Sequence, residues 1–256
     1  MSSEVERSRK KTEDSGWETV KVIIQALLIA FVVRTFFFQP FNIPSESMVP
    51  TLRVGDYLFV SKYSYGYSKH SFPFSPPIFS GRVMADTPER GDVAVFKLPS
   101  DNETDYIKRV IGLPGDRIQV RGGRLYLNDK LVPRQAIERF IDEDTGRDWP
   151  QYVETLPNGK SYRIIEVNGD RGPLDNTLVY TVPPGHYFMM GDNRDNSADS
   201  RVLPNMDSRW VGYVPLENYV GKAEVLFFST DGTARLWEVW AWFGAIRYGR
   251  LFSVIE

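Results

Sequence analysis

A serine between two prolines is the first residue in this chain whose setting suggests chemistry. Ser47 lies in the ten residues IPSESMVPTL, from Ile43 to Leu52, which follow the only long apolar run. Pro44 and Pro50 each fix φ, so they hold the segment in a defined extended or turning path. A serine hydroxyl becomes a useful nucleophile once a base removes its proton. Taken alone, the segment is more typical of a connector between an anchor and a domain, so its interpretation depends on a base elsewhere.

A lysine inside an apolar strand is the candidate base. Lys108 lies in YIKRVIGLPGD, from Tyr106 to Asp116, and strand alternation places Ile107 and Arg109 on the opposite face. Such a lysine usually extends its amine to solvent. If the amine is buried instead, its pKa falls and it can accept a proton. A lysine with a pKa of ~10.4 is neutral about once in several thousand molecules at pH 7, so a useful base needs a pKa about two to three units lower, or more.

A polar loop supplies the third group of candidate residues. GDNRDNSADSR, from Gly191 to Arg201, is too polar for a core strand. Its Asp and Asn side chains could be calcium ligands, but the loop lacks the central glycine and the terminal glutamate of an EF-hand. We therefore interpret the loop as a hydrogen-bonded network that fixes the geometry of a site.

The composition excludes several other kinds of chemistry. The 256 residues carry a net charge of −2, which provides no basic field for nucleic acid, and they include no cysteine. Disulfides, thiolate metal sites and cysteine nucleophiles are therefore excluded. The two histidines, His70 and His186, leave little material for a zinc site. The same scarcity of histidine favours a different base for a serine hydrolase, and no cofactor or metal is predicted.

One apolar run near the N-terminus is predicted to cross a membrane. VIIQALLIAFVVRTFFF runs from Val22 to Phe38, and the segment 17–39 is long enough for a hydrocarbon core of about 30 Å. Trp17 and the terminal phenylalanines suit the membrane interfaces, and Arg34 can reach the nearer surface. The alternatives are a cleaved signal peptide, for which no small-residue cleavage site follows, and a buried helix of a soluble protein.

The basic residues near this run predict its orientation. Five of them precede the run and Arg53 is the first after it, and basic residues favour the cytoplasmic side. We therefore predict a cytoplasmic tail over 1–16, a single pass through the inner (cytoplasmic) membrane, and a catalytic domain on the outer, periplasmic side. The five residues are Arg7, Arg9, Lys10, Lys11 and Lys21.

The rest of the chain is predicted to be mainly β. An antiparallel β-sheet catalytic core is expected over 40–115 and 185–230, with a smaller β-rich domain inserted over 116–184. The aromatic segment 63–87 is either an ordered surface loop or a membrane-proximal extension. The C-terminal segment 231–256 is aromatic but too charged and glycine-broken for a second span, and is interfacial or packs on the core. The seven predicted strands are Tyr57–Ser61, Asp92–Lys97, Tyr106–Ile111, Arg117–Val120, Arg124–Leu127, Tyr187–Met190 and Lys222–Phe228.

Together, the three motifs resemble those of the bacterial type I signal peptidases, membrane-bound serine proteases with a Ser/Lys dyad. They occur in that family's order, and the resemblance covers roughly Pro40 to Phe228. It implies that Ser47 is the nucleophile and Lys108 the general base, and that the reaction passes through an acyl-enzyme. It also implies an oxyanion hole formed by the Ser45 hydroxyl and the Ser47 backbone N–H.

The resemblance implies supporting roles as well. Ser197 would orient the lysine amine, Asp199 and Arg201 would form a structural ion pair behind the site, and Arg109 follows the lysine as it does in the family. Glu46 occupies a position that is often small there, so its role is open. The implied partners are signal-peptide-bearing preproteins, cleaved at Ala-x-Ala-like sites, and the lipid bilayer. The second transmembrane helix of some members is not expected, and the oligomeric state is left open.

Three alternatives remain at this point. Another anchored Ser/Lys protease of the same clan, such as an organelle inner-membrane peptidase, would share the dyad and differ in its substrates. A Ser-His-Asp hydrolase would need His70 or His186, and the chain has no G-x-S-x-G motif. A non-catalytic anchored β module would be favoured by the loss of Ser47 or Lys108, and both residues are present.

Overall fold

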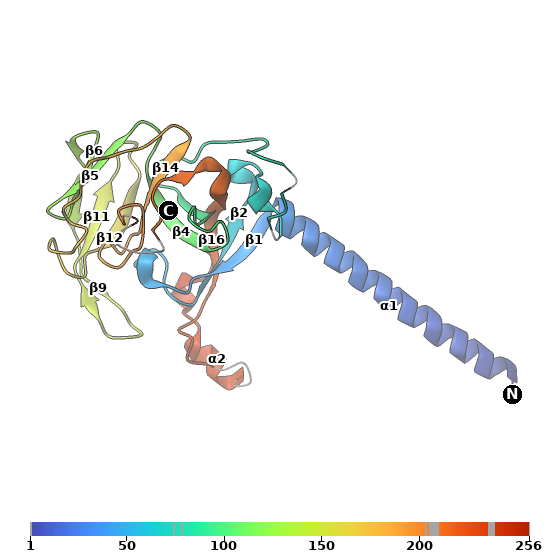
Figure 1. Ribbon diagram of the computed structural model, residues 1–256. Helices are drawn as coiled ribbons and strands as arrows, with labels where there is room; N and C mark the ends of the chain where they lie inside the picture. Colours follow the sequence, from blue (N-terminus) through green and yellow to red (C-terminus); the bar gives the residue numbers. More distant parts are fainter. Residues whose placement is uncertain are drawn as a thin grey trace.

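One long helix leaves a body of antiparallel sheets and carries the N-terminus far from it (Figure 1). The mainly β, antiparallel fold with one apolar N-terminal helix, predicted from the sequence, is confirmed. The computed structural model describes residues 2–73, 75–77, 79–202, 204, 210–234 and 239–255, with side chains from residue 16 onward except that of residue 239.

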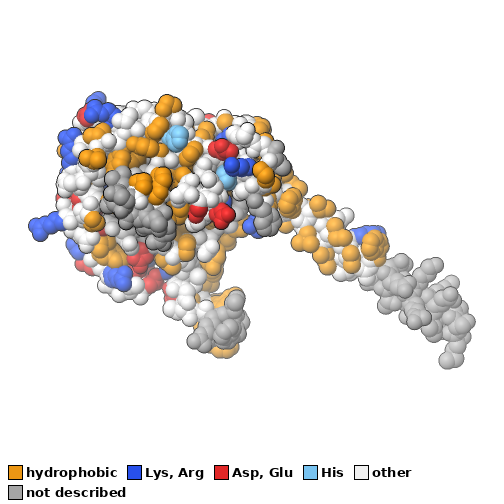
Figure 2. All heavy atoms as spheres, in the orientation of Figure 1, with side chains coloured by type: hydrophobic (Ala, Val, Ile, Leu, Met, Phe, Trp, Pro, Cys, Tyr) orange, Lys and Arg blue, Asp and Glu red, His pale blue; other side chains and the backbone are white. Residues whose placement is uncertain are grey.

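Helix α1 (Ser2–Phe36) exposes apolar side chains over its described part from Gly16 onward (Figure 2). Within the segment Gly16–Phe36, an 18-residue stretch has a mean hydropathy of 1.9, and 6% of that stretch is buried. Leu27 and Ile29 are each 65% exposed. Because the protein leaves this apolar surface uncovered, it is unfavourable in water and suits a hydrocarbon core. By its length and composition, the segment fits a membrane anchor.

The helix ends before the predicted anchor does. The sequence predicts an anchor over 17–39, whereas α1 ends at Phe36 and strand β1 (Phe38–Asn42) follows at once. The reason is pairing with the next strand, together with Pro40, whose ring nitrogen cannot donate a helical hydrogen bond. Phe37 alone separates the helix from the sheet.

A central antiparallel sheet of eight strands carries most of the body. Each of the seven predicted strands overlaps an observed one, five of them in this sheet. Its middle strands are largely buried, and their side chains form the apolar clusters that support the site. In order across the sheet the strands are β1, β2 (Asp56–Ser61), β16 (Tyr219–Ser229), β3 (Val93–Lys97), β4 (Asp105–Gly112), β14 (His186–Met190) and β15 (Val214–Pro215), with β17 (Ser253–Val254) beside β16.

The strands between β4 and β14 form smaller sheets of their own. The two larger ones pack on the main sheet, since the apolar cluster that they share includes Ile111 and Phe188. We propose that 116–184 is an inserted unit between 40–115 and 185–230, as the sequence predicts. The smaller sheets have the orders β13 (Tyr180–Thr181), β5 (Arg117–Arg121), β6 (Arg124–Leu127), β7 (Lys130–Leu131); β12 (Ser161–Ile165), β11 (Gln151–Thr155), β8 (Arg134–Ala136); and β10 (Asp148–Trp149), β9 (Phe140–Ile141).

The described part of segment 63–87 packs against the end of α1. The Tyr67 hydroxyl donates to the Phe36 carbonyl at 2.8 Å, and the two rings meet edge-on with centroids 5.9 Å apart. Tyr65 is 2% exposed and belongs to the core beneath. The described part of the segment therefore packs at the base of the helix, while the depth of the segment in lipid stays a prediction.

The C-terminal segment leaves aromatic rings exposed on the short helix α2 (Val239–Ala245). Trp240 is 77% exposed and Phe243 is 73% exposed. Trp237, another aromatic residue of the segment 231–256, lies outside the described residues. Exposed aromatic rings suit a membrane interface, so an interfacial role stays our prediction for this segment.

Candidate active site

Ser47 lies in the 3₁₀ turn η1 (Glu46–Met48), which is held from two directions. Met48 is fully buried and Ile43 is 3% exposed, and both belong to one apolar cluster of the main sheet. On the other side, the Asn193 N–H in the polar loop donates to the Ser47 carbonyl at 3.1 Å. The turn is therefore held by packing on the apolar cluster of the main sheet and by a hydrogen bond from the polar loop.

The Lys108 amine lies directly against the Ser47 hydroxyl. Its Nζ is 2.7 Å from Ser47 Oγ and 2.9 Å from the Ile107 carbonyl oxygen. Lys108 is 4% exposed, and burial lowers its pKa to about 8, although the charges of Asp199 and Asp192 oppose that shift. Since a desolvated amine can take a hydroxyl proton, this pair has the geometry of a nucleophile and its base.

Ser45 and Glu46, which precede Ser47, contact different groups. Ser45 Oγ lies 3.3 Å from Ser47 Oγ, so the two hydroxyls share one side of the turn. The Glu46 carboxylate instead accepts a hydrogen bond from Asn196 at 3.3 Å and lies 3.6 Å from the Arg147 guanidinium. Glu46 therefore contacts the polar loop and the inserted region, which gives a structural place to a residue whose role the sequence leaves open.

Ser197 lies beside the nucleophile turn, without a hydrogen bond to the lysine. Its Oγ is buried and has no hydrogen-bond partner among the described residues. A Cβ on Gly191 would lie 2.2 Å from Ser197 Oγ and 2.5 Å from the Ser47 carbonyl oxygen, so these three residues are closely packed. The predicted role of Ser197 in orienting Lys108 stays a prediction.

The predicted pair of Asp199 and Arg201 is present behind the site. The Arg201 guanidinium donates from Nε and Nη2 to the two carboxylate oxygens at 2.9 and 2.8 Å. Asp199 also accepts from the Gly191 N–H at 3.0 Å. Both side chains are at most 1% exposed, so this is a bidentate ion pair in a dry environment.

Two further buried ion pairs, not identified from the sequence, hold the loop. Arg109 donates to both oxygens of Asp192 at 2.9 and 2.8 Å. Arg194 donates to both oxygens of Glu154 in β11 at 3.0 and 2.5 Å. The mixed charges of GDNRDNSADSR indicate paired residues, but they do not indicate the partners. The pairs join the loop to β4 and to the inserted sheets.

Neither histidine contacts Ser47 among the described residues. His70 Nδ1 lies 3.1 Å from Ser75 Oγ, and His186 Nδ1 lies 2.9 Å from the Pro184 carbonyl oxygen. The side-chain partners of Ser47 are Lys108 and Ser45. The geometry therefore favours the lysine and not a histidine as the base.

A comparison with protein families places the chain among the peptidases. The family described as "Signal peptidase, peptidase S26" matches residues 16–228, which is most of the chain. The chain is therefore an enzyme of the peptidase class.

Curated relatives narrow the assignment. Signal peptidase I of Rickettsia typhi (strain ATCC VR-144 / Wilmington) is 40% identical over 263 residues, covering 96% of this chain and 97% of the relative. The signal peptidase I of Rickettsia canadensis (strain McKiel) is 41% identical, covering 91% and 86%. The chain thus belongs to the signal peptidase family, peptidase S26, within its signal peptidase I group, and the family predicted from the three motifs is confirmed.

A solved structure gives a weaker likeness. The crystal structure of a signal peptidase I from Enterococcus faecalis V583 aligns with a TM-score of 0.30 and 24% identity, covering 54% of this chain and 97% of that chain. A TM-score this low does not support a conclusion about the fold.

Proposed function

We propose that this enzyme removes N-terminal signal peptides from exported preproteins, with Ser47 as the nucleophile and neutral Lys108 as the general base. The observation that carries the proposal is the 2.7 Å contact between Lys108 Nζ and Ser47 Oγ in a buried site. The relatives named signal peptidase I support the reaction class.

The proposed reaction has two halves. Lys108 takes the Ser47 hydroxyl proton as Oγ attacks the scissile carbonyl carbon, and the proton then passes to the leaving amine. Lys108 next takes a proton from a water molecule, which attacks the carbonyl carbon of the acyl-enzyme. The bond from that carbon to Ser47 Oγ breaks, and the proton passes from Lys108 to Oγ. The Ser45 hydroxyl and the Ser47 N–H stabilise the tetrahedral oxyanion, an effect of about 3 kcal/mol per donor. Neither half requires a cofactor.

The surrounding residues are proposed to position this chemistry. The Asp199–Arg201 and Arg109–Asp192 pairs fix the polar loop, and Ser197 orients the lysine when its hydroxyl turns toward Nζ. Their burial and bidentate geometry support this role for the two ion pairs.

The proposed substrates and location follow from the family and the anchor. Cleavage is expected after small residues at the first and third positions before the cut, as in Ala-x-Ala. The apolar segment Gly16–Phe36 supports a single pass through the inner membrane. The basic residues before it support a cytoplasmic N-terminus and a catalytic domain on the outer side, in contact with preproteins and lipid.

The full chain in detergent is expected to cut an Ala-x-Ala preprotein at one bond, at a rate that rises with pH through an apparent pKa near 8. Burial lowers the pKa of Lys108 to about 8, and only the neutral amine can take the serine proton. About one amine in ten is then neutral at pH 7, so kcat/KM falls about tenfold for each pH unit below 7. Initial rates between about pH 5 and 10 measure the profile.

The matched control is the same preprotein with phenylalanine at the residue before the cut. It is expected to remain intact, because a site for a small side chain excludes a large one. A rate independent of pH on the acid side would contradict Lys108 as the base. Efficient cleavage of the phenylalanine substrate would contradict the proposed specificity.

Alanine at Gly191 is expected to lower kcat/KM by about 100-fold or more, because a displacement of the nucleophile by about 1 Å has effects of this size. The added Cβ would lie 2.5 Å from the Ser47 carbonyl oxygen, so the turn must move. Preprotein cleavage measures the loss. Gly249→Ala is the control, since a Cβ there has nothing within 4 Å. Equal activity of the two variants would show that the turn tolerates displacement.

A further inference from the structure

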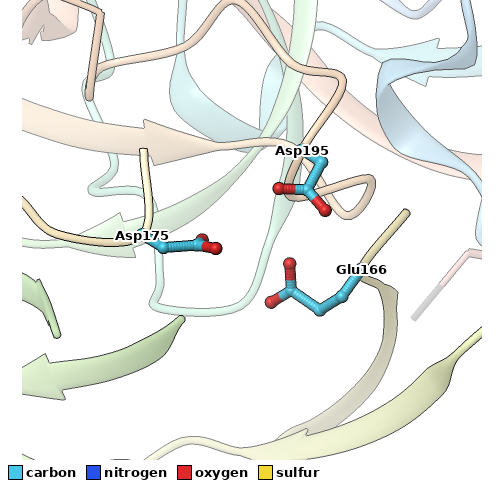
Figure 3. Close-up of side chains that lie close together, drawn as sticks. All are labelled: Glu166, Asp175 and Asp195. Atoms are coloured by element: carbon cyan, nitrogen blue, oxygen red, sulfur yellow. The ribbon is translucent and has the colours of Figure 1, made fainter. Parts of the chain in front are cut away.

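Three carboxylates from separate segments meet behind the polar loop. Glu166 follows β12, Asp175 precedes β13, and Asp195 lies in the loop itself. One ligand oxygen of each lies within 4.8 Å of the others (Figure 3). The cluster therefore joins the inserted region to the segment that holds the nucleophile turn.

Each carboxylate uses one oxygen to bind a protein donor. These bonds fix the three side chains and leave a second oxygen on each for another ligand. The bonds are from the Gly172 N–H to Asp175 Oδ2 at 2.5 Å, from the Asn168 N–H to Asp195 Oδ2 at 2.6 Å, and from Arg134 to Glu166 Oε1 at 3.3 Å.

The second oxygen of Glu166 is the observation that points to a ligand. Glu166 is 1% exposed, and its Oε2 has no hydrogen-bond partner among the described residues. Figure 3 shows its carboxyl group directed into the space between Asp175 and Asp195. A buried polar atom without a partner is costly, and like charges close to it add to the cost. Burial and then the two aspartates raise the pKa of Glu166 to about 8, although Arg194 opposes this shift.

The backbone beside the cluster leaves room for these oxygens. A Cβ on Gly172 would lie 2.0 Å from Asp195 Oδ1 and 3.3 Å from Asp175 Oδ2. Any larger residue at this position would displace the Asp195 carboxylate. The absence of a side chain therefore lets two of the three carboxylates approach each other.

We propose that Glu166, Asp175 and Asp195 bind one calcium ion. Calcium takes oxygen ligands at about 2.3–2.6 Å, so two ligands of one ion can lie about 5 Å apart, whereas the shorter bonds of magnesium allow only about 4.2 Å. The three oxygens lie within 4.8 Å of one another, so one calcium ion can reach all of them. A set of three protein carboxylates also suits calcium better than magnesium, which proteins usually bind with one or two. The set contains only carboxylates, which also disfavours zinc. The ion clamps the polar loop to the inserted region.

The test uses the full chain in detergent, depleted with EGTA and then titrated with CaCl2 in equilibrium dialysis and thermal unfolding. We expect one calcium ion per chain and a rise in Tm of about 4 °C at ten times the Kd. Glu166→Gln is expected to weaken calcium binding at least tenfold and to abolish the calcium-dependent rise in Tm. The control is Asp129→Asn, which changes an exposed carboxylate outside the cluster. This variant is expected to keep both the calcium binding and the rise in Tm.

Equal calcium binding by wild type and Glu166→Gln overturns the site, as does no binding up to about 10 mM. If Glu166→Gln does not fold, the less buried Asp195→Asn replaces it with the same expectation. A Tm that does not change with calcium but falls as the pH rises toward 8 would show that the three carboxylates share a proton instead. That result also overturns the proposal. Because binding is the readout, the result is independent of peptidase activity.

Discussion

Alanine at Ser47 or at Lys108 abolishes preprotein cleavage by the full chain in detergent: this is the result we expect. Ser47→Ala removes the attacking oxygen, and Lys108→Ala removes the amine 2.7 Å from it. Each substitution is expected to lower kcat by about 10⁴-fold or more, and the double variant is expected to be no worse, since groups that act as a unit fail together. Initial rates of processing, with thermal unfolding as the check on folding, measure the effect.

His186→Ala is the matched control for both variants. The His186 ring bonds to the Pro184 carbonyl and makes no contact with the described site, so cleavage should continue at the wild-type rate. Full activity of folded Ser47→Ala or Lys108→Ala would contradict the dyad. A large loss in folded His186→Ala would instead favour a histidine base.

Asparagine at Asp192 is expected to lower the free energy of unfolding by about 3–5 kcal/mol, because it leaves a buried charge without its partner. Arg109 is 1% exposed and donates twice to Asp192, which also accepts from Thr51 at 2.6 Å. The amide of asparagine can replace only one acceptor and turns N–H groups toward the guanidinium. Denaturant unfolding of the full chain in detergent measures the change.

The control removes an ion pair of similar length at the surface. Asp129 lies 2.6 Å from Arg117, but both side chains are about half exposed. Asp129→Asn is therefore expected to change stability by less than about 0.5–1 kcal/mol. If the two variants lose equal stability, the Arg109–Asp192 pair is not what holds the loop in place.

Local sequence patterns predicted the strands well, because the alternation of side chains along a strand and the turn residues that bound it depend on residues close in sequence. Tyr106–Ile111 and Arg124–Leu127 are examples, and both lie within or match observed strands. The end of α1 was less predictable. The three phenylalanines are equally apolar, but Phe38 belongs to β1 because that strand pairs with β2. Tertiary pairing, which the sequence does not reveal, decides that boundary.

In the candidate site, too, local motifs were predictable from the sequence and long-range partners were not. Ser47, Lys108 and the Asp199–Arg201 pair follow from motifs, since each lies within a short characteristic string. The ion-pair partners of the loop do not follow from a motif, because a residue such as Glu154 lies 40 positions from Arg194 in the sequence. The carboxylates 166, 175 and 195 are likewise assembled only by the fold. Long-range electrostatic pairing therefore limits how much of the site could be predicted.

The junction of α1 and β1 has a mechanical consequence. With Phe37 alone between helix and strand, and with Tyr67 hydrogen-bonded to the Phe36 carbonyl, the anchor has no slack at its root. Because the junction is this short, we expect a tilt of the helix to tilt the body with it. If the helix is the membrane anchor that we propose, this junction would hold Ser47 at a fixed height above the bilayer. The thickness of the bilayer would then influence which peptide bond of a substrate reaches Ser47.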